Sequence, residues 1–542
     1  MSATRRVTVI GLDGATFNLL DRLRAAGDMP ELDRLMRAGC HGELRSTFPP
    51  LTPPAWSSFM TGKNPGKHGV VSFRRPPIGY RTGDFISAKS LRARTLWEIV
   101  GEAGLRVGAI NVVPSYPVQP VNGFMVACML SPPGAQDIIY PREFRPLLGD
   151  DYVISLEPPK QLVATDPDYR TQALDYLGRL RRLGLSRREV ALRLMEKSPC
   201  DLLALILYEP DRVQHFFWKH LVGSGPEGGD AAVVAELAEA ARAIYRDLDQ
   251  TIGAIVRAAG PDATTLIISD HGFGDAPDRF VYVNRWLADR GWLHVHRTWR
   301  LRLSAVRRLP DRLRKRLDTV ENIFVDWSRT VAWCDAMETR SAGLWLNVKG
   351  RQTEGCVEPG AEYERLRDEI RAALADLRDD GRPVFDVVAR REDVYEGPVT
   401  ELAPDLLLYC KPSHGLRFNG LRPELRARAP FARFVEYGFT GAHQPSGIYI
   451  AAGPSIAPLG RRETKPIEAL APTILALLGL PIPDGMDAPP MIEFLTPEAR
   501  EATPVRYVAD TARAEGGDEG AYESEQDREQ VEARLRALGY VE

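Results

Sequence analysis

Six side chains that commonly bind metal ions lie at the ends of apolar runs in this chain. Borderline divalent ions such as zinc take mixed carboxylate and imidazole ligands at about 2.0–2.2 Å. Three aspartates and three histidines would serve a pair of such cations. The sequence therefore predicts a two-metal site built from Asp13, Asp211, His215, Asp270, His271 and His443.

Some of these residues also have a purely structural interpretation. Asp13 precedes a helix expected to begin near Thr16, so capping that helix is its alternative role. Asp211 and His215 are four residues apart and directly follow Pro210, a good first-turn residue, which places both on one helix face. That spacing suits chelation, and the alternative is a helix cap followed by a half-buried histidine.

The remaining ligand candidates depend on a bend in the chain. Adjacent residues at a strand end point to opposite sides, so Asp270 and His271 serve two metals only if the backbone turns there. Gly272 and Gly274 permit that turn. His443 is expected in a loop with no helix to cap, which favours a functional role for it.

Thr52 is the candidate nucleophile. With Pro53 after it, the threonine is predicted to be an N-cap with proline at the first helical position. A helix N-terminus favours an anion, so a hydroxyl there can meet a phosphoryl group and be ionised by a coordinated metal. The capping role and the chemical role are compatible.

The elements that must position these residues are short apolar strands that alternate with amphipathic helices. The strands are expected at 7–12, 106–113, 123–128, 202–208, 264–269, 406–410 and 447–452. Nearly continuous apolar strands indicate an α/β fold, with a mostly parallel central sheet and helices on both faces. Ligands bind at the carboxyl ends of such strands, where Asp13, Asp211 and Asp270 fall.

Composition changes along the chain suggest its organisation. We expect a catalytic core over 1–290 and 341–498, with an amphipathic helix at 361–380 that covers the sheet. The arginine- and leucine-rich insertion 291–340 is expected to be helical, as a cap over the site, a solvated surface helix or a membrane-surface element. The acidic tail 499–542 is expected to be flexible and to end in a short helix.

Composition narrows the function classes. With 44% hydrophobic and 26% charged residues the chain is an ordinary globular protein, and its net charge of −3 argues against nucleic acid as a partner. Six scattered cysteines without a C-x-x-C pair suit reduced thiols. The first apolar run is too short for a signal peptide, and no run reaches the roughly 20 residues of a membrane span. We therefore expect a cytoplasmic protein without a transmembrane segment; its oligomeric state does not follow from the sequence.

Together, these segments resemble the alkaline phosphatase superfamily, and most of all its type I phosphodiesterase/nucleotide pyrophosphatase branch. The resemblance covers about residues 5–490 and rests on five blocks in the family's order. They are the strand ending at Asp13, the Thr52 segment that ends in TGKNPGKHG, E-P-D-x-x-x-H at 209–215, S-D-H-G at 269–272 and G-x-H at 441–443.

The resemblance implies a hydrolase of phosphoric esters with two divalent ions, zinc or alternatively manganese. It implies two ligand sets, Asp211, His215 and His443 for one ion and Asp13, Asp270 and His271 for the other, with Thr52 as a further ligand that bridges to the second ion. It further implies that Thr52 attacks phosphorus and that the resulting phosphothreonine is hydrolysed in a second step. The expected substrate is a small-molecule phosphoester.

Two residues depart from the pattern of nucleotide pyrophosphatases. Phe73 stands where that family has an asparagine that holds a phosphate oxygen, and Pro53 has no N–H to offer to phosphate. Arg74 or Arg75 could replace the asparagine by bidentate binding, although a solvated loop position also explains either arginine. The step from phosphoryl chemistry to a nucleotide substrate is therefore open, and lipid head groups and phosphonates stay as alternatives.

Other members of the superfamily fit less well. A sulfatase needs C/S-x-P-x-R, and Cys40 in AGCHGEL lacks that context. A cofactor-independent phosphoglycerate mutase would use serine where this chain has Thr52. Phosphonate hydrolysis, phosphomonoester or phosphomutase chemistry, and a non-catalytic metal-binding interaction protein stay open.

Overall fold

The computed structural model divides the chain into two compact units. It describes residues 5–77, 79–80, 83–149, 152–157, 162–226, 228–296, 324–416, 424–425, 427, 429–433, 438–513, 522 and 524–537. The first unit takes in Met1–Val70, Ile86–Asp275 and Glu436–Leu538, and the second takes in Val71–Phe85, Ala276–Val435 and Gly539–Glu542. All seven candidate site residues belong to the first unit.

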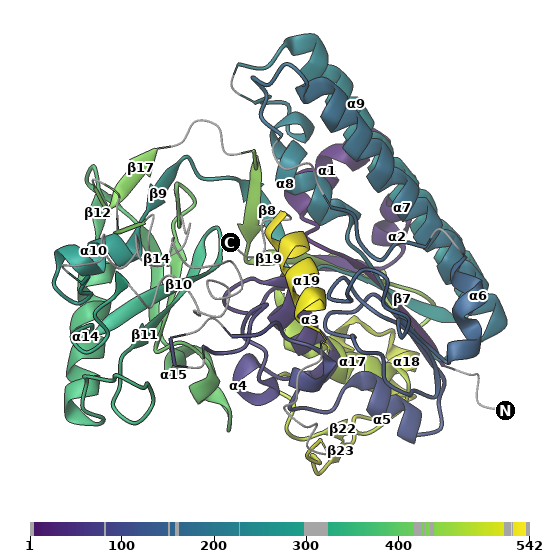
Figure 1. Ribbon diagram of the computed structural model, residues 1–542. Coiled ribbons are helices and arrows are strands. Elements are labelled where there is room, and N and C mark those ends of the chain that lie inside the picture. The colour runs from purple at the N-terminus through teal and green to yellow at the C-terminus, as the bar shows by residue number, and fades with distance from the viewer. Residues whose placement is uncertain are drawn as a thin grey trace. The chain divides into compact units, whose positions relative to one another are not determined.

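A ten-stranded sheet forms the centre of the first unit (Figure 1). Its order is β20–β2–β19–β7–β1–β6–β3–β4–β5, and β21 pairs with β2. Strands β1, β3, β4, β6 and β7 run parallel, whereas β19 is antiparallel to β2 and β7. The bounds are β1 Arg6–Leu12, β2 Cys40–Arg45, β3 Val107–Ile110, β4 Gly123–Val126, β5 Ile139–Tyr140, β6 Leu202–Leu207, β7 Ala263–Ile268, β19 Ser446–Ala452, β20 Gly460–Arg461 and β21 Lys465–Pro466. The predicted fold class, a mostly parallel α/β sheet, is confirmed.

Helices cover both faces of this sheet. On one face, Ile10, Leu205 and Ile267 are buried in a core shared with α1, α2, α7 and α9. On the other face, Gly11 leaves room for Trp56 of α3, since a Cβ at Gly11 would lie 2.5 Å from the indole ring. These helices are α1 Phe17–Ala25, α2 Pro30–Ala38, α3 Thr52–Thr61, α7 Tyr169–Lys197 and α9 Ala231–Ala259.

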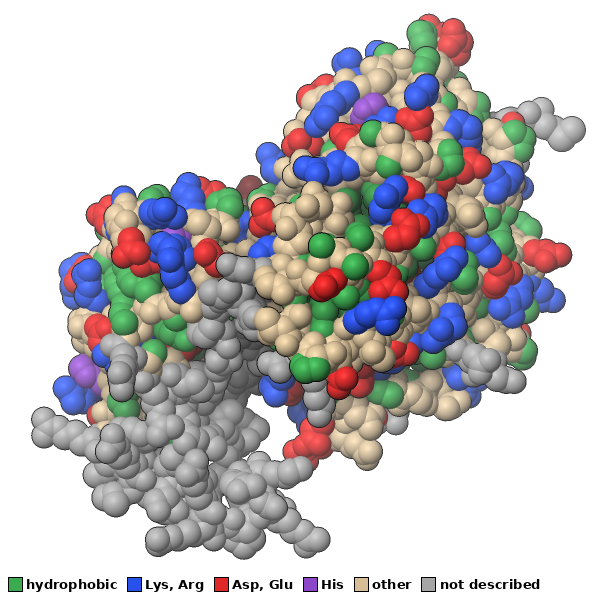
Figure 2. Space-filling model, turned by 90° about the horizontal axis from the view of Figure 1, so that it is seen from above, with side chains coloured by type: hydrophobic (Ala, Val, Ile, Leu, Met, Phe, Trp, Pro, Cys, Tyr) green, Lys and Arg blue, Asp and Glu red, His purple; other side chains and the backbone are tan. Residues whose placement is uncertain are grey.

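The two longest helices among the described residues were not predicted from the sequence. Helices α7 and α9 lie side by side, and ion pairs such as Arg170–Glu236 (2.6 Å) and Arg181–Asp247 (2.5 Å) join them. On the face drawn in Figure 2, acidic and basic side chains are interspersed. The pairing of α7 with α9 is a tertiary contact, which the hydropathy of either segment alone does not reveal.

The second unit contains a four-stranded antiparallel sheet, β10–β11–β15–β14, with α14 packed on β14. Its elements are β10 Ala332–Glu338, β11 Ser341–Leu346, α14 Ala361–Ala375, β14 Phe385–Arg390 and β15 Leu406–Cys410. The apolar run 406–410 is therefore a strand of this second sheet, and its placement in the central sheet was wrong. A fully buried strand reads as a continuous apolar run in either sheet. The predicted helix at 361–380 is present as α14.

The predicted domain boundaries at 290 and 341 do not coincide with the ends of the two units. Much of the helical cap predicted at 291–340 falls on 297–323, outside the described residues. Of the flexible tail predicted at 499–542, residues 514–521, 523 and 538–542 also lie outside the described residues. The tail's described part makes ordered contacts: β23 Tyr507–Val508 pairs with β22 Ile482–Pro483, and α19 Glu525–Ala537 is helical.

All six cysteines are free thiols. Among the helices that the structure describes, none combines the length and the apolar character that crossing a bilayer requires.

Candidate active site

Helix α8, Glu209–Leu221, carries two of the predicted ligands. It starts directly after β6 with Pro210 in its first turn, as the sequence predicts. His215 Nε2 lies 3.3 Å from Asp211 Oδ1, one helical turn away, and both side chains are buried. The four-residue spacing therefore brings an imidazole and a carboxylate together.

Asp13 and Asp270 meet just beyond the ends of the neighbouring strands β1 and β7. Gly14 adopts a left-handed φ of 69°, and its N–H donates to Asp270 Oδ1 at 3.1 Å. Trp56 Nε1 donates to Asp13 Oδ2 at 3.0 Å. Helix α1 begins at Phe17 with Thr16 at its cap position, so the alternative role of Asp13 as a helix cap is wrong.

His271 lies where the chain passes from β7 to β8, Gly272–Asp275. Glycine is needed at 272 for close approach rather than for a left-handed φ, because a Cβ there would lie 2.0 Å from the Ser446 carbonyl oxygen. The Nδ1–H of His271 donates to the carbonyl of Gly272 at 3.2 Å. That bond leaves the Nε2 lone pair facing the two aspartates.

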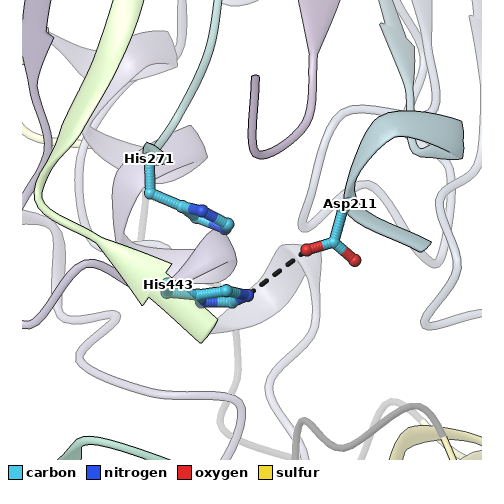
Figure 3. Close-up of side chains that lie close together, drawn as sticks. All are labelled: Asp211, His271 and His443. Atoms are coloured by element: carbon cyan, nitrogen blue, oxygen red, sulfur yellow. Dashed lines mark hydrogen bonds and ion pairs between the residues drawn. The ribbon is translucent and has the colours of Figure 1, made fainter. Parts of the chain in front are cut away.

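His443 lies in a strand, so its placement in a loop was wrong. Strand β18, Gly441–Gln444, pairs with β8, and this pairing bridges distant parts of the chain. A Cβ at Gly441 would lie 2.4 Å from the Gln214 carbonyl oxygen, so the glycine lets β18 approach α8. His443 donates its Nδ1–H to the carbonyl of Pro50 at 3.3 Å. Its Nε2 is thereby turned toward Asp211 (Figure 3).

Thr52 is the first residue of α3, and Leu51 occupies the cap position. The predicted N-cap role of Thr52 is therefore wrong by one residue. The hydroxyl Oγ1 instead lies 3.3 Å from His271 Nε2, in a fully buried position. Thr52 thus stands at the start of a helix and beside one candidate ligand set.

The structure brings all seven predicted residues together as two adjoining groups. In the first, Asp211 Oδ1, His215 Nε2 and His443 Nε2 lie 3.1–3.3 Å from one another. In the second, His271 Nε2 lies 3.7 Å from Asp13 Oδ1 and 3.3 Å from Asp270 Oδ2. The rings of His271 and His443 stack with centroids 3.7 Å apart, which joins the two groups (Figure 3).

The donor atoms fit divalent cations. Tetrahedral ligands about 2.0–2.1 Å from zinc lie roughly 3.3 Å from one another, which matches the first group. In the second group, Asp13 Oδ1 and Asp270 Oδ2 are buried without a hydrogen-bond partner among the described residues. Lone pairs that converge in a buried site repel one another unless a cation lies between them.

The ionisation of the acids also favours a cation. Burial raises the pKa of Asp13 well above its ordinary value, and the charges of Asp270 and Asp211 add to that rise. Burial likewise raises the pKa of Asp270 to about 8, although the hydrogen bond from the Gly14 N–H acts to lower that pKa. Burial also opposes the ionisation of Asp211, but the adjacent His215 and His443 hold the pKa of that carboxyl well below its usual range. A bound cation would stabilise all three carboxylates in the ionised form.

Burial lowers the pKa of His271 well below its ordinary value, and the nearby His443 adds to that shift. His271 is therefore neutral, which is the form that coordinates a metal. The sequence analysis missed two supporting groups, the Trp56 indole and the Gly14 N–H. Because Gly14 directly follows Asp13, a turn that exposes its N–H could have been predicted from the sequence. The contact of Trp56 with Asp13 arises only from the packing of α3 on β1.

Phe73, which stands in place of the family's asparagine, and the two candidate phosphate-binding residues Arg74 and Arg75 lie in the second unit. Phe73 is fully buried, and the guanidinium of Arg74 lies 4.1 Å from the ring centroid of Phe85. The backbone N–H of Arg75 donates to the carbonyl of Asp84. A role for Arg74 or Arg75 in binding phosphate stays a prediction.

Replacing His443 by alanine is expected to weaken metal binding at the Asp211 group by about 100-fold or more, because a ligand is removed from a set of three. Titration of the metal-free variant with zinc, followed by metal analysis, measures this. His220→Ala is the matched control, since His220 is buried on α8 but contacts Tyr169 outside the site. Equal zinc affinity in the two variants would remove His443 from the ligand set.

Comparisons with known proteins identify the family and the fold. The profile of the type I phosphodiesterase/nucleotide pyrophosphatase family matches residues 7–423. The fold resembles murine ectonucleotide pyrophosphatase/phosphodiesterase 5, solved as an inactive variant with AMP (TM-score 0.52, 13% identity, 91% of this chain and 100% of that chain). It also resembles phosphonoacetate hydrolase from Sinorhizobium meliloti 1021 in complex with phosphonoacetate (TM-score 0.50, 17% identity, 83% and 90%).

The human ectonucleotide pyrophosphatase/phosphodiesterase 5 is similar to the same degree, with a TM-score of 0.52 and 14% identity over 91% of this chain and 100% of that chain. A search of the curated proteins finds no match. The structural likenesses show a shared fold, and the family profile covers most of the chain. This protein therefore belongs to the type I phosphodiesterase/nucleotide pyrophosphatase family of the alkaline phosphatase superfamily, a family of hydrolases that act on phosphoric ester bonds.

Proposed function

We propose that this protein is a metal-dependent phosphodiesterase or pyrophosphatase that acts through a phosphorylated Thr52. The observation that carries the proposal is the convergence of three buried aspartates and three buried histidines beside the Thr52 hydroxyl, in which His271 lies close to the donor atoms of both groups. Asp211, His215 and His443 would hold one divalent cation, and Asp13, Asp270 and His271 the other. When bound, such cations lower the pKa of a nearby hydroxyl and offset the negative charge of phosphoryl oxygens.

Each catalytic step assigned to the chain uses Thr52. In the first step Thr52 Oγ1 forms a bond to phosphorus while the bond to the leaving oxygen breaks, and the leaving group departs. In the second step a water oxygen bonds to the same phosphorus, the bond to Thr52 breaks, and phosphate or a phosphomonoester is released. The dipole of α3 favours the negative charge that develops on the phosphoryl group, whereas Pro53 and Pro54 offer it no backbone N–H.

Neighbouring residues hold the nucleophile and the acids in place. Pro53 and Pro54 restrict the backbone of the first turn of α3, and burial excludes bulk water from the hydroxyl. The indole of Trp56, on the same helix, fixes the carboxylate of Asp13. The helix that carries the nucleophile therefore also orients one of the acids.

We expect the metal-loaded protein to cleave bis(4-nitrophenyl) phosphate with a higher kcat/KM than 4-nitrophenyl phosphate. A buried nucleophile beside two ligand groups favours in-line displacement at phosphorus, and the family profile favours a diester. Initial rates of nitrophenolate release at matched substrate concentrations measure this preference. A higher kcat/KM for the monoester would contradict the proposed diesterase activity and would indicate a phosphomonoesterase instead.

Phosphonate hydrolysis is the second candidate. The fold is shared with a phosphonoacetate hydrolase, and that protein was solved with phosphonoacetate bound. Release of inorganic phosphate from phosphonoacetate by the metal-loaded protein, at a kcat/KM above that for the diester, would favour this candidate.

A further inference from the structure

The C-terminal helix α19 docks on loops at the carboxyl edge of the central sheet (Figure 1). Val531 and Leu535 of this helix are fully buried. Just before it, the hydroxyl of Tyr522 donates to the carbonyl of Leu130 at 3.1 Å, and its ring stacks on Tyr116 with centroids 6.1 Å apart. The helix therefore has apolar anchors of its own on the first unit.

This helix inserts an arginine into the protein. Arg534 is 5% exposed, and its Nη1 donates to the carbonyls of Met129 (3.0 Å) and Ser131 (2.8 Å). Its Nε is buried without a hydrogen-bond partner among the described residues. Burial lowers the pKa of Arg534, which reflects the cost of keeping this charge away from water. The charge of the exposed Glu157 opposes that shift, whereas the neighbouring Arg212 adds to it, so the buried cation has two carbonyl acceptors and a surface carboxylate as its counter-charge.

A second buried guanidinium reaches the same loop from the candidate active site. Arg212 is 4% exposed, and it directly follows Asp211 on α8. Its Nη2 lies 3.0 Å from Met129 Sδ, a weak acceptor for a cationic donor. Arg212 and Arg534 therefore converge on Met129 from α8 and α19, two elements far apart in the sequence.

The location links this pair to the active site. Met129 lies in the loop after β4, and β4 follows β6 and β3 in the order of the sheet. The candidate ligands lie at the ends of β7, β1 and β6. Two strand spacings, from β6 to β4, amount to about 10 Å. A substrate that extends along the carboxyl edge would place a second group beside the two arginines.

We propose that Arg212 and Arg534 form an anion-binding subsite that takes a phosphate or carboxylate group of the substrate, other than the phosphoryl group that Thr52 attacks. The proposal rests on the proposed function for the identity of the substrate. Guanidinium groups bind both kinds of anion through paired N–H donors, and burial strengthens such bonds. The C-terminal helix would then contribute to substrate recognition by the core.

Sulfate is a direct probe of the subsite. Isothermal titration calorimetry with sulfate would compare the metal-loaded full-length protein with its Arg534→Gln variant. We expect sulfate affinity to fall by about tenfold or more in the variant, because a charge-assisted partner is removed. Arg536→Gln is the matched control, since Arg536 lies on the same helix, is exposed and pairs with Glu532. Equal sulfate affinity in wild type and Arg534→Gln would overturn the subsite.

A second variant separates loss of charge from loss of the helix. Arg534→Lys keeps the cation, and we expect it to retain more sulfate affinity than Arg534→Gln. Hydrogen exchange of the α19 amides would report whether the helix stays docked in each variant. If Arg534→Lys binds sulfate as weakly as Arg534→Gln while α19 stays protected in both, the assignment to the buried charge is wrong.

A pair of substrates tests whether the subsite binds an anionic group of the substrate rather than a free anion. Two 4-nitrophenyl alkyl phosphodiesters of equal length would be compared, one ending in a carboxylate about 10 Å from phosphorus and the other in a hydroxyl. We expect wild type and Arg536→Gln to prefer the charged diester by about tenfold in kcat/KM, and Arg534→Gln to lose that preference.

The two experiments distinguish failure of the subsite from failure of the proposed function. If sulfate affinity depends on Arg534 but wild type shows no preference between the diesters, the site binds a free anion and the assignment to substrate is overturned. If wild type hydrolyses neither diester while sulfate affinity still depends on Arg534, the proposed function fails and the anion-binding site stands.

Discussion

Replacing Thr52 by alanine is expected to lower kcat for an aryl phosphodiester by about 10³-fold or more, with the metal content unchanged. The variant lacks the oxygen that bonds to phosphorus, whereas the six candidate ligands stay in place. The Thr52 hydroxyl contacts only His271 among these ligands, at 3.3 Å. Steady-state rates together with metal analysis of the same preparation measure both parts of the prediction.

Two further variants show whether the effect belongs to the hydroxyl. Thr52→Ser keeps an oxygen at the same position and should retain much more activity than Thr52→Ala. Thr61→Ala removes a buried hydroxyl at the other end of α3, where Thr61 Oγ1 donates to the Ser57 carbonyl, and should leave turnover near the wild-type value. Turnover in Thr52→Ala within a few-fold of Thr61→Ala would exclude Thr52 as the nucleophile. Trapping a phosphorylated threonine with ³²P-labelled substrate would locate the covalent step.

Removing metal with a chelator is expected to reduce activity to the uncatalysed background, and zinc or manganese should restore it with about two equivalents bound. In the proposed mechanism the buried lone pairs of both ligand groups bind cations, and these cations activate Thr52. Metal should also stabilise the fold, by about 2.7 kcal/mol per site at a free metal concentration 100 times Kd. Metal-free protein that neither ion reactivates would discredit the catalytic interpretation.

The pH dependence of metal binding follows from Asp270. In the metal-free protein burial raises the pKa of this carboxyl to about 8, so below that pH its proton must leave before a cation binds. Metal affinity should therefore fall as pH decreases through about 8, and binding should release protons, which calorimetry in buffers of different ionisation enthalpy measures. Asp270→Asn should lose the metal of one group. Asp249→Asn, which alters a buried carboxylate that accepts the backbone N–H groups of Glu31 and Leu32, should keep both metals.

Much of the fold could be predicted because its signals are local. Strands buried on both faces need continuous apolar residues, so β1, β6 and β7 are visible in the chain itself. A continuous apolar run does not indicate which sheet a strand joins, so the run 406–410 was assigned to the wrong sheet. Helices α7 and α9 were missed because much of their stability comes from mutual packing, which a single segment does not display.

For the candidate site, too, the local features could be predicted from the sequence and the long-range contacts could not. The types and spacing of Asp13, Thr52, Asp211, His215, Asp270, His271 and His443 identified a set of residues with one chemistry, because ligand preference belongs to the side chain and not to its surroundings. The i, i+4 spacing of Asp211 and His215 even predicted one contact, since helix geometry is local.

The tertiary structure alone decided how these residues combine. The pairing of β18 with β8 carries His443 to α8, and the packing of α3 on β1 sets Thr52 beside His271 and Trp56 beside Asp13. The docking of α19 buries Arg534 near Arg212. Each of these contacts joins segments that are distant along the chain, and its position depends on the packing of the whole unit. The chain thus specifies its chemistry residue by residue, whereas the geometry that makes this chemistry usable arises only when the sheet and its helices assemble.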